Sequence, residues 1–309
     1  MRLIIFNLRK GCNILAFLFF SIQANHAQQV EGQLEGQIRE LISGFKGEIG
    51  VYVKTERTGK IVEINADSIF PTASIVKVPL LMGIMDRIGR DSLQYHDTLT
   101  WLDTIRYDPG EDIIPYLKVG TRVELSKVMM LMMTISDNNA SLWLQAIAGG
   151  GTAVNEMLDR YGYRFTRVNS RTPGRESSRN IYGWGQTTPR EMARIFEDIV
   201  DYKIFDSAGC DRMIRIMGRQ YWDEEALSAI PPNIFVASKN GAVNASRSEV
   251  MYVNGPDPYI LSIFTKNNAD RSWEPGNEAW VLTRKISKLV WEHHQKRQNH
   301  RFRGQARLK

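Results

Sequence analysis

Two residues that could carry out chemistry, Ser74 and Lys77, stand three positions apart in the apolar run FPTASIVKVPLL. On a helix this spacing places both side chains on one face, where they can meet. Burial among apolar neighbours favours the neutral form of a lysine, and a neutral amine beside a serine hydroxyl is a general base beside a nucleophile. The alternative is an ordinary helix start, in which Ser74 is a cap and Lys77 extends to solvent.

Two further polar groups follow later in the chain. The tripeptide Ser-Asp-Asn at 136–138 comes after a methionine-rich segment, and Lys-Asn-Gly at 239–241 ends an apolar run with the composition of a strand. Each group is ordinary alone. Together, serine, lysine and amide side chains from three separated places could converge on one carbonyl group, as acyl transfer requires.

These three motifs, in this order and with similar separations, resemble those of the penicillin-recognising serine hydrolases, specifically class A β-lactamases. The segment TTPREMARIF is also similar to the helix start after the family's omega loop, and the resemblance covers residues 30–293. It implies an α+β fold in which an all-helical lobe packs against a five-stranded antiparallel sheet flanked by helices. It also implies that the protein opens β-lactam rings through an ester on a serine, which water then hydrolyses.

The resemblance assigns a role to each motif. Ser74 would be the nucleophile, Lys77 its base or proton partner, and Ser136 the group that passes a proton to the leaving nitrogen. Asn138 would bind the substrate's side-chain amide and hold Lys77, and Lys239 would supply positive field near the substrate carboxylate.

An oxyanion hole is also implied by the resemblance. It would consist of the backbone N–H groups of Ser74 and of Ala242, the residue after Gly241. No histidine, metal or other cofactor is expected. His96 is the only histidine between residues 28 and 292, which leaves a Ser-His-Asp triad poorly supported and argues against a multi-histidine zinc site.

The segment after residue 170 departs from the family pattern. Class A enzymes deacylate with a glutamate that is followed four residues later by an asparagine, and here Glu176 and Asn180 keep that spacing without the usual leucine. We therefore expect Glu176 to hold the hydrolytic water with help from Asn180. The alternative is that both are solvated loop residues.

Two residues expected to contact the substrate, Asn240 and Arg247, also differ from the family pattern or match it only in approximate position. Asn240 replaces the usual threonine or serine, and its amide can donate to a carboxylate but is bulkier than a hydroxyl. Arg247 lies close to the family's carboxylate-binding arginine, and its planar fork suits that partner. A charge on the rim of the site is the alternative for Arg247.

The periodicity along the chain predicts strands at both ends with helices between them. A helix over 30–45 precedes a hairpin over 47–65, and three strands over 234–240, 248–254 and 259–265 precede a last helix over 277–293. Between them we expect helices over 73–88, 125–134, 138–148, 153–161, 189–202 and 207–217, and a loop over 170–188. The methionines at 129–133 are interpreted as core filling rather than a redox or copper site.

The first residues predict export. Basic residues precede an apolar segment over 14–22 that is too short to span a bilayer comfortably, so residues 1–27 are interpreted as a cleaved signal peptide, with an uncleaved anchor as the alternative. Residues 28–295 would form one hydrolase domain in the periplasm or outside the cell, without stable membrane insertion. Cys210 is then the only cysteine, which excludes an intramolecular disulfide.

The net charge of +6 and the isoelectric point near 9.2 owe much to the last seventeen residues. We interpret 296–309 as a solvated or disordered basic tail, with contact to anionic envelope polymers as the alternative. Motifs that bind nucleic acid are missing. The expected partner is therefore a small β-lactam or a cell-wall peptide, and the expected state is a monomer.

Three functions share the expected nucleophile. The first is β-lactam hydrolysis with water placed by Glu176. The second is a carboxypeptidase that takes the D-alanyl peptides of the cell wall. The third is not enzymatic: a penicillin-binding or sensor protein that is acylated and stays so, although the membrane-linked partner segment of such sensors is missing here.

Overall fold

The computed structural model describes residues 31–107 and 110–306, so the expected signal peptide lies outside the described residues. The longer helices are α1 (Gly32–Ile42), α2 (Lys77–Gly89), α3 (Leu125–Thr134), α4 (Asn138–Ile147), α5 (Gly150–Arg160), α6 (Glu176–Tyr182), α7 (Pro189–Val200), α8 (Ser207–Met217) and α9 (Glu278–Ala306). The main strands are β1 (Glu48–Thr55), β2 (Ile61–Ile64), β8 (Phe235–Val243), β9 (Ser246–Asn254) and β10 (Tyr259–Lys266).

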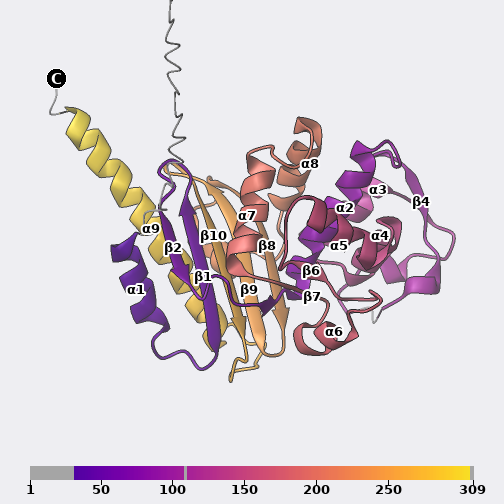
Figure 1. Cartoon of the computed structure of the whole chain (residues 1–309), viewed down its shortest axis with the longest axis horizontal. Coiled ribbons are helices and arrows are strands. Elements are labelled where there is room, and N and C mark those ends of the chain that lie inside the picture. The colour runs from indigo at the N-terminus through magenta and orange to yellow at the C-terminus, as the bar shows by residue number, and fades with distance from the viewer. Residues whose placement is uncertain (1–30, 108–109, 307–309) are drawn as a thin grey trace, which may run out of the picture.

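These five strands form one antiparallel sheet in the order β2-β1-β10-β9-β8. Strands from the two ends of the chain meet where β1 pairs with β10, with Gly50 opposite Phe264. The expected α+β fold, with its five-stranded antiparallel sheet completed by both ends of the chain, is thus confirmed. Strand β8 lies at the sheet edge next to the helical lobe (Figure 1).

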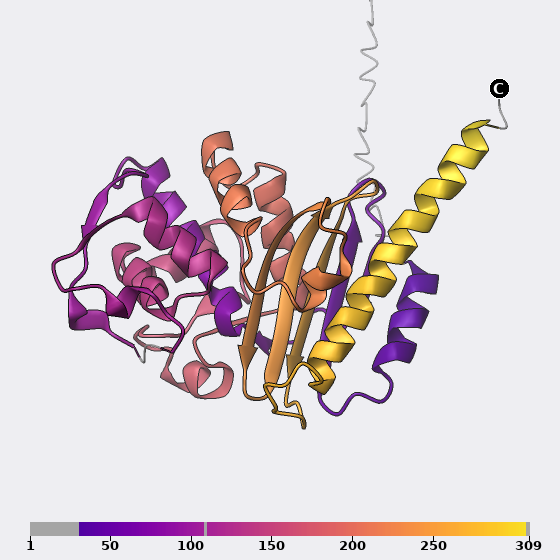
Figure 2. The ribbon, with the colours of Figure 1, turned by 180° about the vertical axis from the view of Figure 1, so that it is seen from behind.

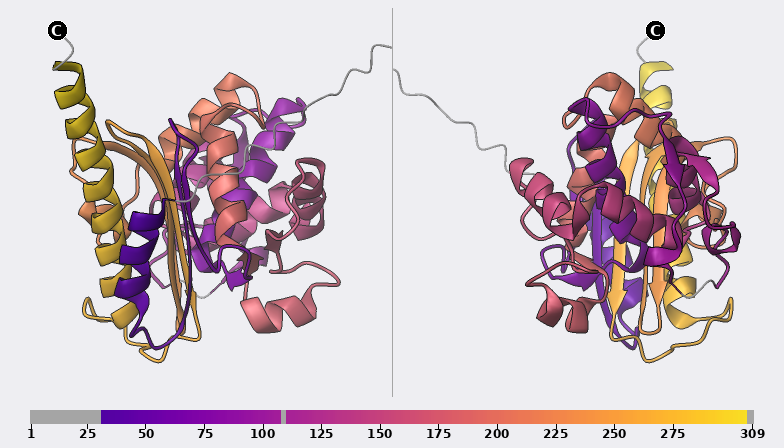
Figure 3. Two further views of the ribbon diagram at one scale, coloured as in Figure 1. Left: turned by 60° about the vertical axis from the view of Figure 1, so that its left-hand side comes forward. Right: turned by 90° about the vertical axis from the view of Figure 1, so that its right-hand side faces the viewer.

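The sheet has a helical layer on each face (Figures 1 and 3). Helices α1 and α9 cover the outer face, and Figure 2 shows them side by side against the strands. An apolar core that includes Leu34, Val51 and Ile286 lies between them and the sheet. Helix α7 lies on the other face with the remaining helices behind it, and it packs there through an apolar side that includes Ile195 and Phe196.

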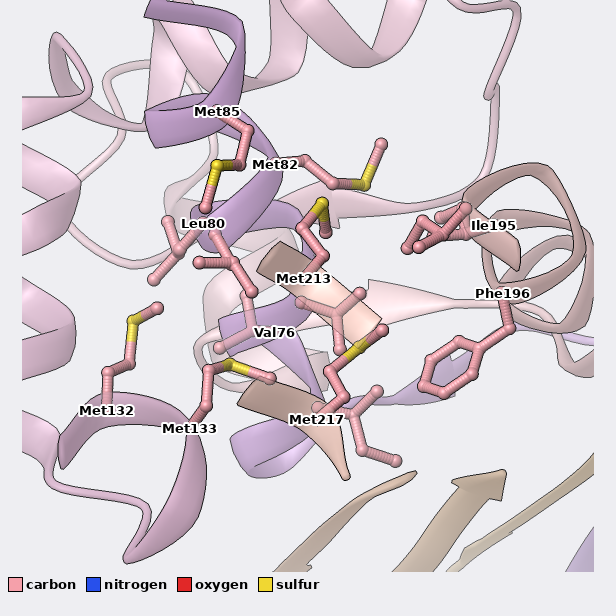
Figure 4. Packing of buried hydrophobic residues seen from close by; sticks show 14 of the residues in the cluster. Val76, Leu80, Met82, Met85, Met132, Met133, Ile195, Phe196, Met213 and Met217 are labelled. Carbon is pink, nitrogen blue, oxygen red and sulfur yellow. The ribbon is translucent and has the colours of Figure 1, made fainter. Parts of the chain in front are cut away.

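Helix α2 runs through the middle of the helical lobe, and every residue from Lys77 to Met85 is buried. Methionines of α2, α3 and α8 meet around it, among them Met82, Met132 and Met213 (Figure 4). Flexible thioether side chains fill irregular space between helices well. Met129, Met132 and Met133 are completely buried in this apolar core, which supports the interpretation as core filling, whereas Met130 is 40% exposed.

The helix expected over 73–88 begins with one 3₁₀ turn, η1 (Ala73–Val76), and continues as α2. Several other short elements escape the sequence pattern. They are the helices η2 (Asp103–Ile105), η3 (Ile114–Tyr116) and η4 (Ala226–Ala229), and the strands β3 (Phe70–Pro71), β4 (Thr98–Thr100), β5 (Arg122–Glu124), β6 (Arg167–Val168) and β7 (Gly185–Thr187). Elements of two to four residues are too short to show a period.

One expectation about an irregular segment is wrong: the segment 170–188 contains α6 and β7 rather than loop alone. Helix α6 buries no residue, so apolar periodicity could not reveal it. The last helix, expected over 277–293, continues to Ala306 in α9. Among the described residues no helix is both long and apolar enough to cross a membrane.

Candidate active site

Ser74 lies in η1, the single turn that leads into α2, directly beside the edge strand β8. The preceding residue, Ala73, has φ of +45°, a left-handed conformation that costs a residue with a Cβ roughly 1–2 kcal/mol. The sharp turn lets the chain enter the buried helix while Ser74 stays at a cavity wall. Such strain directly before a polar residue at a cavity wall is typical of functional sites.

Lys77 is completely buried, and its Nζ reaches four oxygen atoms. It lies 2.9 Å from Ser74 Oγ, 2.9 Å from Ser136 Oγ, 2.6 Å from the Ser136 carbonyl oxygen and 2.9 Å from Asn138 Oδ1. The structure thus brings together the first two motifs, with the expected nucleophile Ser74 among them. Lys77 does not extend to solvent, so the ordinary helix start is wrong.

The contacts of Lys77 fit a neutral amine. The carbonyl oxygen of Ser136 and Oδ1 of Asn138 can only accept, and they use the two N–H groups that a neutral amine has. Its single lone pair can then accept a hydrogen bond from one hydroxyl at a time, that of Ser74 or that of Ser136. Burial lowers the pKa of Lys77 to about 7, against the opposing charges of Asp112 and Asp137. Near neutral pH a large fraction of the molecules therefore hold the base form.

Two buried aspartates fix the loop that carries Ser136. Asp137 caps α4 by accepting from the backbone N–H of Ala140, and it also accepts from the N–H groups of Ile113 and Ile114. Asp112 accepts in turn from the N–H groups of Asn138 and Asn139. These contacts tie the segment at 112–114 to the segment at 136–139, which carries Ser136.

The same loop carries a strained residue. Ser136 has φ of +64°, which is rare for any residue other than glycine, asparagine or aspartate. Its carbonyl oxygen and its hydroxyl both reach Lys77 Nζ in this conformation. The aspartate contacts around it offset the conformational cost and keep both groups in position.

Strand β8 supplies the third motif, but the side chains of Lys239 and Asn240 do not line the cavity. Lys239 is completely buried, and its Nζ donates to the backbone carbonyl and to Oδ1 of Asn240, at 3.0 and 2.9 Å. Asn240 Nδ2 points to the Trp222 carbonyl oxygen at 3.5 Å. Burial lowers the pKa of Lys239, and the charge of Lys77 lowers it further. Lys239 is thus electrostatically coupled to the nucleophile's base.

The closest approach of β8 to the nucleophile is at Gly241. A Cβ there would lie 2.5 Å from the Thr72 carbonyl oxygen and 3.0 Å from the backbone nitrogen of Ser74. Only glycine allows the strand and η1 to come so close. Ala242, the next residue, lines the same cavity as Ser74, as an oxyanion hole between their backbone N–H groups would need.

We expect Gly241→Ala to slow acylation by a penicillin by about 10²-fold, because β8 must move away from Ser74 and small misplacements of reacting groups have effects of this size. Stopped-flow or mass-spectrometric acylation rates would measure it. Gly36→Ala is the matched control, since a Cβ at this position in α1 meets nothing within 4 Å. Equal acylation rates in the two variants would show that the close contact does not position the oxyanion hole.

A cavity of about 550 Å³ opens over Ser74. Its walls come from η1, from the end of α6 and the two residues after it, from the β8–β9 turn and from the end of β10. The lining residues are Pro71, Ala73, Ser74, Tyr107, Asn138, Ile181, Tyr182, Gly183, Trp184, Ala242, Val243, Ala245, Ser246, Lys266 and Asn267. None of them is acidic. The volume suits a small bicyclic or dipeptide-sized ligand.

Glu176 and Asn180 are not brought to the nucleophile. Both are exposed on α6, neither lines the cavity, and Glu176 Oε1 accepts from the backbone N–H of Gly174 at 3.2 Å. Helix α6 directs these two side chains away from the cavity, and the residues that line the cavity here are Ile181 and the three that follow it. The expectation that Glu176 holds the hydrolytic water is therefore corrected, and the alternative of solvated residues fits the structure.

Arg247 does not reach the cavity either. It is completely buried, with its guanidinium 4.4 Å from the ring centre of Trp273 and 4.6 Å from that of Trp280. Neighbours along a strand point to opposite faces, so Ser246 lines the cavity while Arg247 points into the layer of tryptophans. Both expectations for Arg247, a substrate carboxylate partner and a rim charge, are wrong.

Some wall residues were not predicted from the sequence. Tyr107 lies in an irregular segment and packs edge-on against Trp184, with ring centres 5.1 Å apart. Lys266 and Asn267 lie at the end of β10, where only a strand was expected. No motif distinguishes these three residues. The pairing of β10 with β1 carries Lys266 and Asn267 to the cavity, and a hydrogen bond from the backbone N–H of Tyr107 to Asn139 Oδ1 holds Tyr107 there. Within the described ranges no group of side chains is arranged to hold a metal ion.

Comparisons with known proteins agree with this arrangement. A model of a family described as the beta-lactamase enzyme family matches residues 33–294. A beta-lactamase of Streptomyces fradiae is 24% identical over 83% of this chain and 79% of its own length. Beta-lactamase VEB-1 of Pseudomonas aeruginosa is 21% identical over 91% of this chain and 96% of its own.

Among solved structures, PBP-A superposes with a TM-score of 0.76 and 23% identity, covering 87% of this chain and 98% of that chain. A mutant of PBP-A, described as an acyl-enzyme complex with penicillin G, superposes equally well. At this identity the likeness shows a shared fold.

Proposed function

The chain belongs to the beta-lactamase enzyme family and is a serine hydrolase of β-lactams, and from this premise we propose that Ser74 forms the acyl-enzyme. One observation carries the proposal: the buried Lys77 Nζ lies 2.9 Å from both Ser74 Oγ and Ser136 Oγ. A single base thus touches the nucleophile and the hydroxyl that would serve the leaving nitrogen.

Acylation then follows from the contacts. Neutral Lys77 takes the proton of Ser74, whose Oγ bonds to the lactam carbonyl carbon. The C–N bond breaks as Ser136 gives its proton to the leaving nitrogen, and Lys77 returns a proton to Ser136. The ring is open, the ester is on Ser74, and Lys77 is neutral again. The N–H groups of Ser74 and Ala242 would stabilise the oxyanion.

The other motif residues would position the substrate. Asn138 lines the cavity, and its Oδ1 already holds Lys77, which leaves its N–H₂ group for a carbonyl of the substrate's acyl side chain. Lys239, Asn240 and Gly241 would act from strand β8. When protonated, Lys239 would supply a positive electrostatic field, and its hydrogen bonds to Asn240 fix the direction of its side chain. Gly241 permits the close approach of β8 to Ser74.

Deacylation would use the same base. Since no acidic side chain lines the cavity among the described residues, we assign the proton of the hydrolytic water to the regenerated neutral Lys77, directly or through Ser136. The water oxygen bonds to the ester carbon, and Ser74 leaves with a proton from Lys77. A positioned carboxylate would perform this step faster, so the ester is expected to last longer than in an enzyme that has one.

We therefore expect Glu176→Gln to change the acylation and deacylation rates less than about twofold, since an exposed residue outside the site has little effect on chemistry. The rates would come from the rise and decay of the adduct in intact-mass spectra. A decay that slows a hundredfold, with unchanged acylation, would restore Glu176 as the water-holding group.

The carboxylate-free cavity also favours a second candidate, a penicillin-binding protein or D-alanyl carboxypeptidase that releases β-lactams slowly. The two candidates are separated by following a chromogenic cephalosporin and the penicillin adduct together. Sustained turnover with a transient adduct supports the β-lactamase. A stoichiometric burst and a lasting adduct support the second candidate, and if neither occurs both fail. A periplasmic or secreted location is proposed from residues 1–27.

A further inference from the structure

One charged side chain lines the cavity in the described part of the chain, and it is Lys266. Its neighbour Asn267 lines the cavity too. The buried cations Lys77 and Lys239 lie behind the wall and are engaged in the contacts described above. A half-buried cation in a cavity wall that holds no acidic residue attracts an anion into the cavity.

The ammonium group of Lys266 is held in place by contacts with three neighbouring residues. Its Nζ donates to the Ile69 carbonyl oxygen at 3.1 Å, lies 3.2 Å from Glu48 Oε2 and stands 5.0 Å from the ring centre of Phe70. An ammonium has three N–H groups, and the described residues supply acceptors for two. The third N–H remains for a ligand. Because its side chain is only 23% exposed, Lys266 is partly shielded from water and salt.

Glu48, which lies outside the cavity, positions the side chains of both Lys266 and Asn267. It accepts from Asn267 Nδ2 at 2.6 Å, besides its ion pair with Lys266, and it does not itself line the cavity. The hydrogen bond from Asn267 has the largest effect and lowers the pKa of Glu48; burial opposes it, and the hydrogen bond and charge of Lys266 lower the pKa further. The ionised carboxylate therefore partly neutralises Lys266, so that its removal should strengthen anion binding.

The strand pairing places this cation on one side of the reacting carbonyl. The backbone N–H of Asn268 donates to the Ala245 carbonyl oxygen at 3.1 Å, which fixes the end of β10 beside the β8–β9 turn. Lys239 lies near the other end of the same stretch of β8, and its proposed partner, the ring carboxylate, is attached next to the lactam nitrogen, which is the leaving group. Ala242, proposed for the oxyanion hole, lies between them. Lys266 is therefore on the side of the acyl group.

We propose that Lys266 and Asn267 form a subsite for a carboxylate on the acyl side chain of the substrate. The inference rests on the proposed acylation of Ser74, because the side chain is located relative to the carbonyl that Ser74 attacks. The ligand class is a β-lactam with an anionic acyl side chain. Lys266 would contribute charge and its free N–H, and Glu48 would set the strength of the attraction.

The test compares benzylpenicillin with its α-carboxy derivative, carbenicillin, which differ by one side-chain carboxylate. For each, the second-order acylation rate is measured in the wild type, Lys266→Met and Glu48→Gln. Lys266→Met should lower the carbenicillin-to-benzylpenicillin rate ratio roughly tenfold, the usual effect of one charged hydrogen bond. Glu48→Gln should raise the ratio. Lys288→Met, which removes an exposed cation on α9, is the control for total charge.

Each result has a definite meaning. An unchanged ratio in Lys266→Met, or an equal slowing of both penicillins, would overturn the subsite and leave Lys266 a structural tie between β10 and the segment before Ser74. A ratio that falls in Glu48→Gln would also contradict it. If the wild type is acylated by neither penicillin, the proposed function itself fails, which is a different outcome from a constant ratio.

Discussion

Ser74→Ala is expected to abolish the covalent adduct with penicillin and to reduce hydrolysis by about 10⁴-fold or more, as removal of a serine nucleophile does elsewhere. The reason is structural: Ser74 Oγ is the only nucleophilic atom among the described residues that both lines the cavity and touches Lys77. The adduct is measured by intact mass, and hydrolysis by absorbance of a chromogenic cephalosporin.

The fold should survive this substitution, because a small side chain at a cavity wall is shortened without a new buried void. Ser177→Ala, at an exposed position on α6, is the matched control and should behave as the wild type. Persistent labelling of Ser74→Ala at the wild-type rate would remove Ser74 as the nucleophile and with it the proposed acylation step.

Lys77→Met should slow acylation by about 10³-fold, within the usual contribution of a positioned general base. Methionine has nearly the same length and suits the apolar surroundings, so the loss reports on the amine rather than on packing. Lys127→Met, on the exposed face of α3, is the control.

The wild-type acylation rate should also depend on pH in one direction. Because the pKa of Lys77 is lowered to about 7 and the neutral form is the base, the rate should rise with pH through about 7 and then level off. The dependence should vanish in Lys77→Met. A rate that falls over the same range would mean that the protonated lysine is the active form.

The central elements follow from sequence alone because they carry strong local patterns. Strand-like runs bounded by turn signals over β8, β9 and β10, and helical spacing over α3 and α8, are sufficient to locate these elements. The Ser74 and Lys77 pair could be recognised for a similar reason: three residues of spacing and an apolar surround constrain both geometry and charge.

The rest of the site depends on tertiary structure. Arg247 occupies the expected place in sequence, yet the alternation of β9 turns it toward Trp273 and Trp280. Spacing likewise suggested Glu176, but a short exposed helix directs it to solvent. Lys266 reaches the cavity only because β10 pairs with both β1 and β9. Such placements come from strand pairing between distant segments, which no local pattern encodes.

The most direct test of the account is to locate the acyl group. The mature protein is mixed with penicillin, quenched in acid within seconds, digested, and mapped by tandem mass spectrometry. We predict the added mass of one penicillin on the peptide that contains Ser74, on that serine alone, with a yield that follows the neutral fraction of Lys77. An adduct on another residue, or none at any time or pH, would contradict acylation of Ser74 by β-lactams.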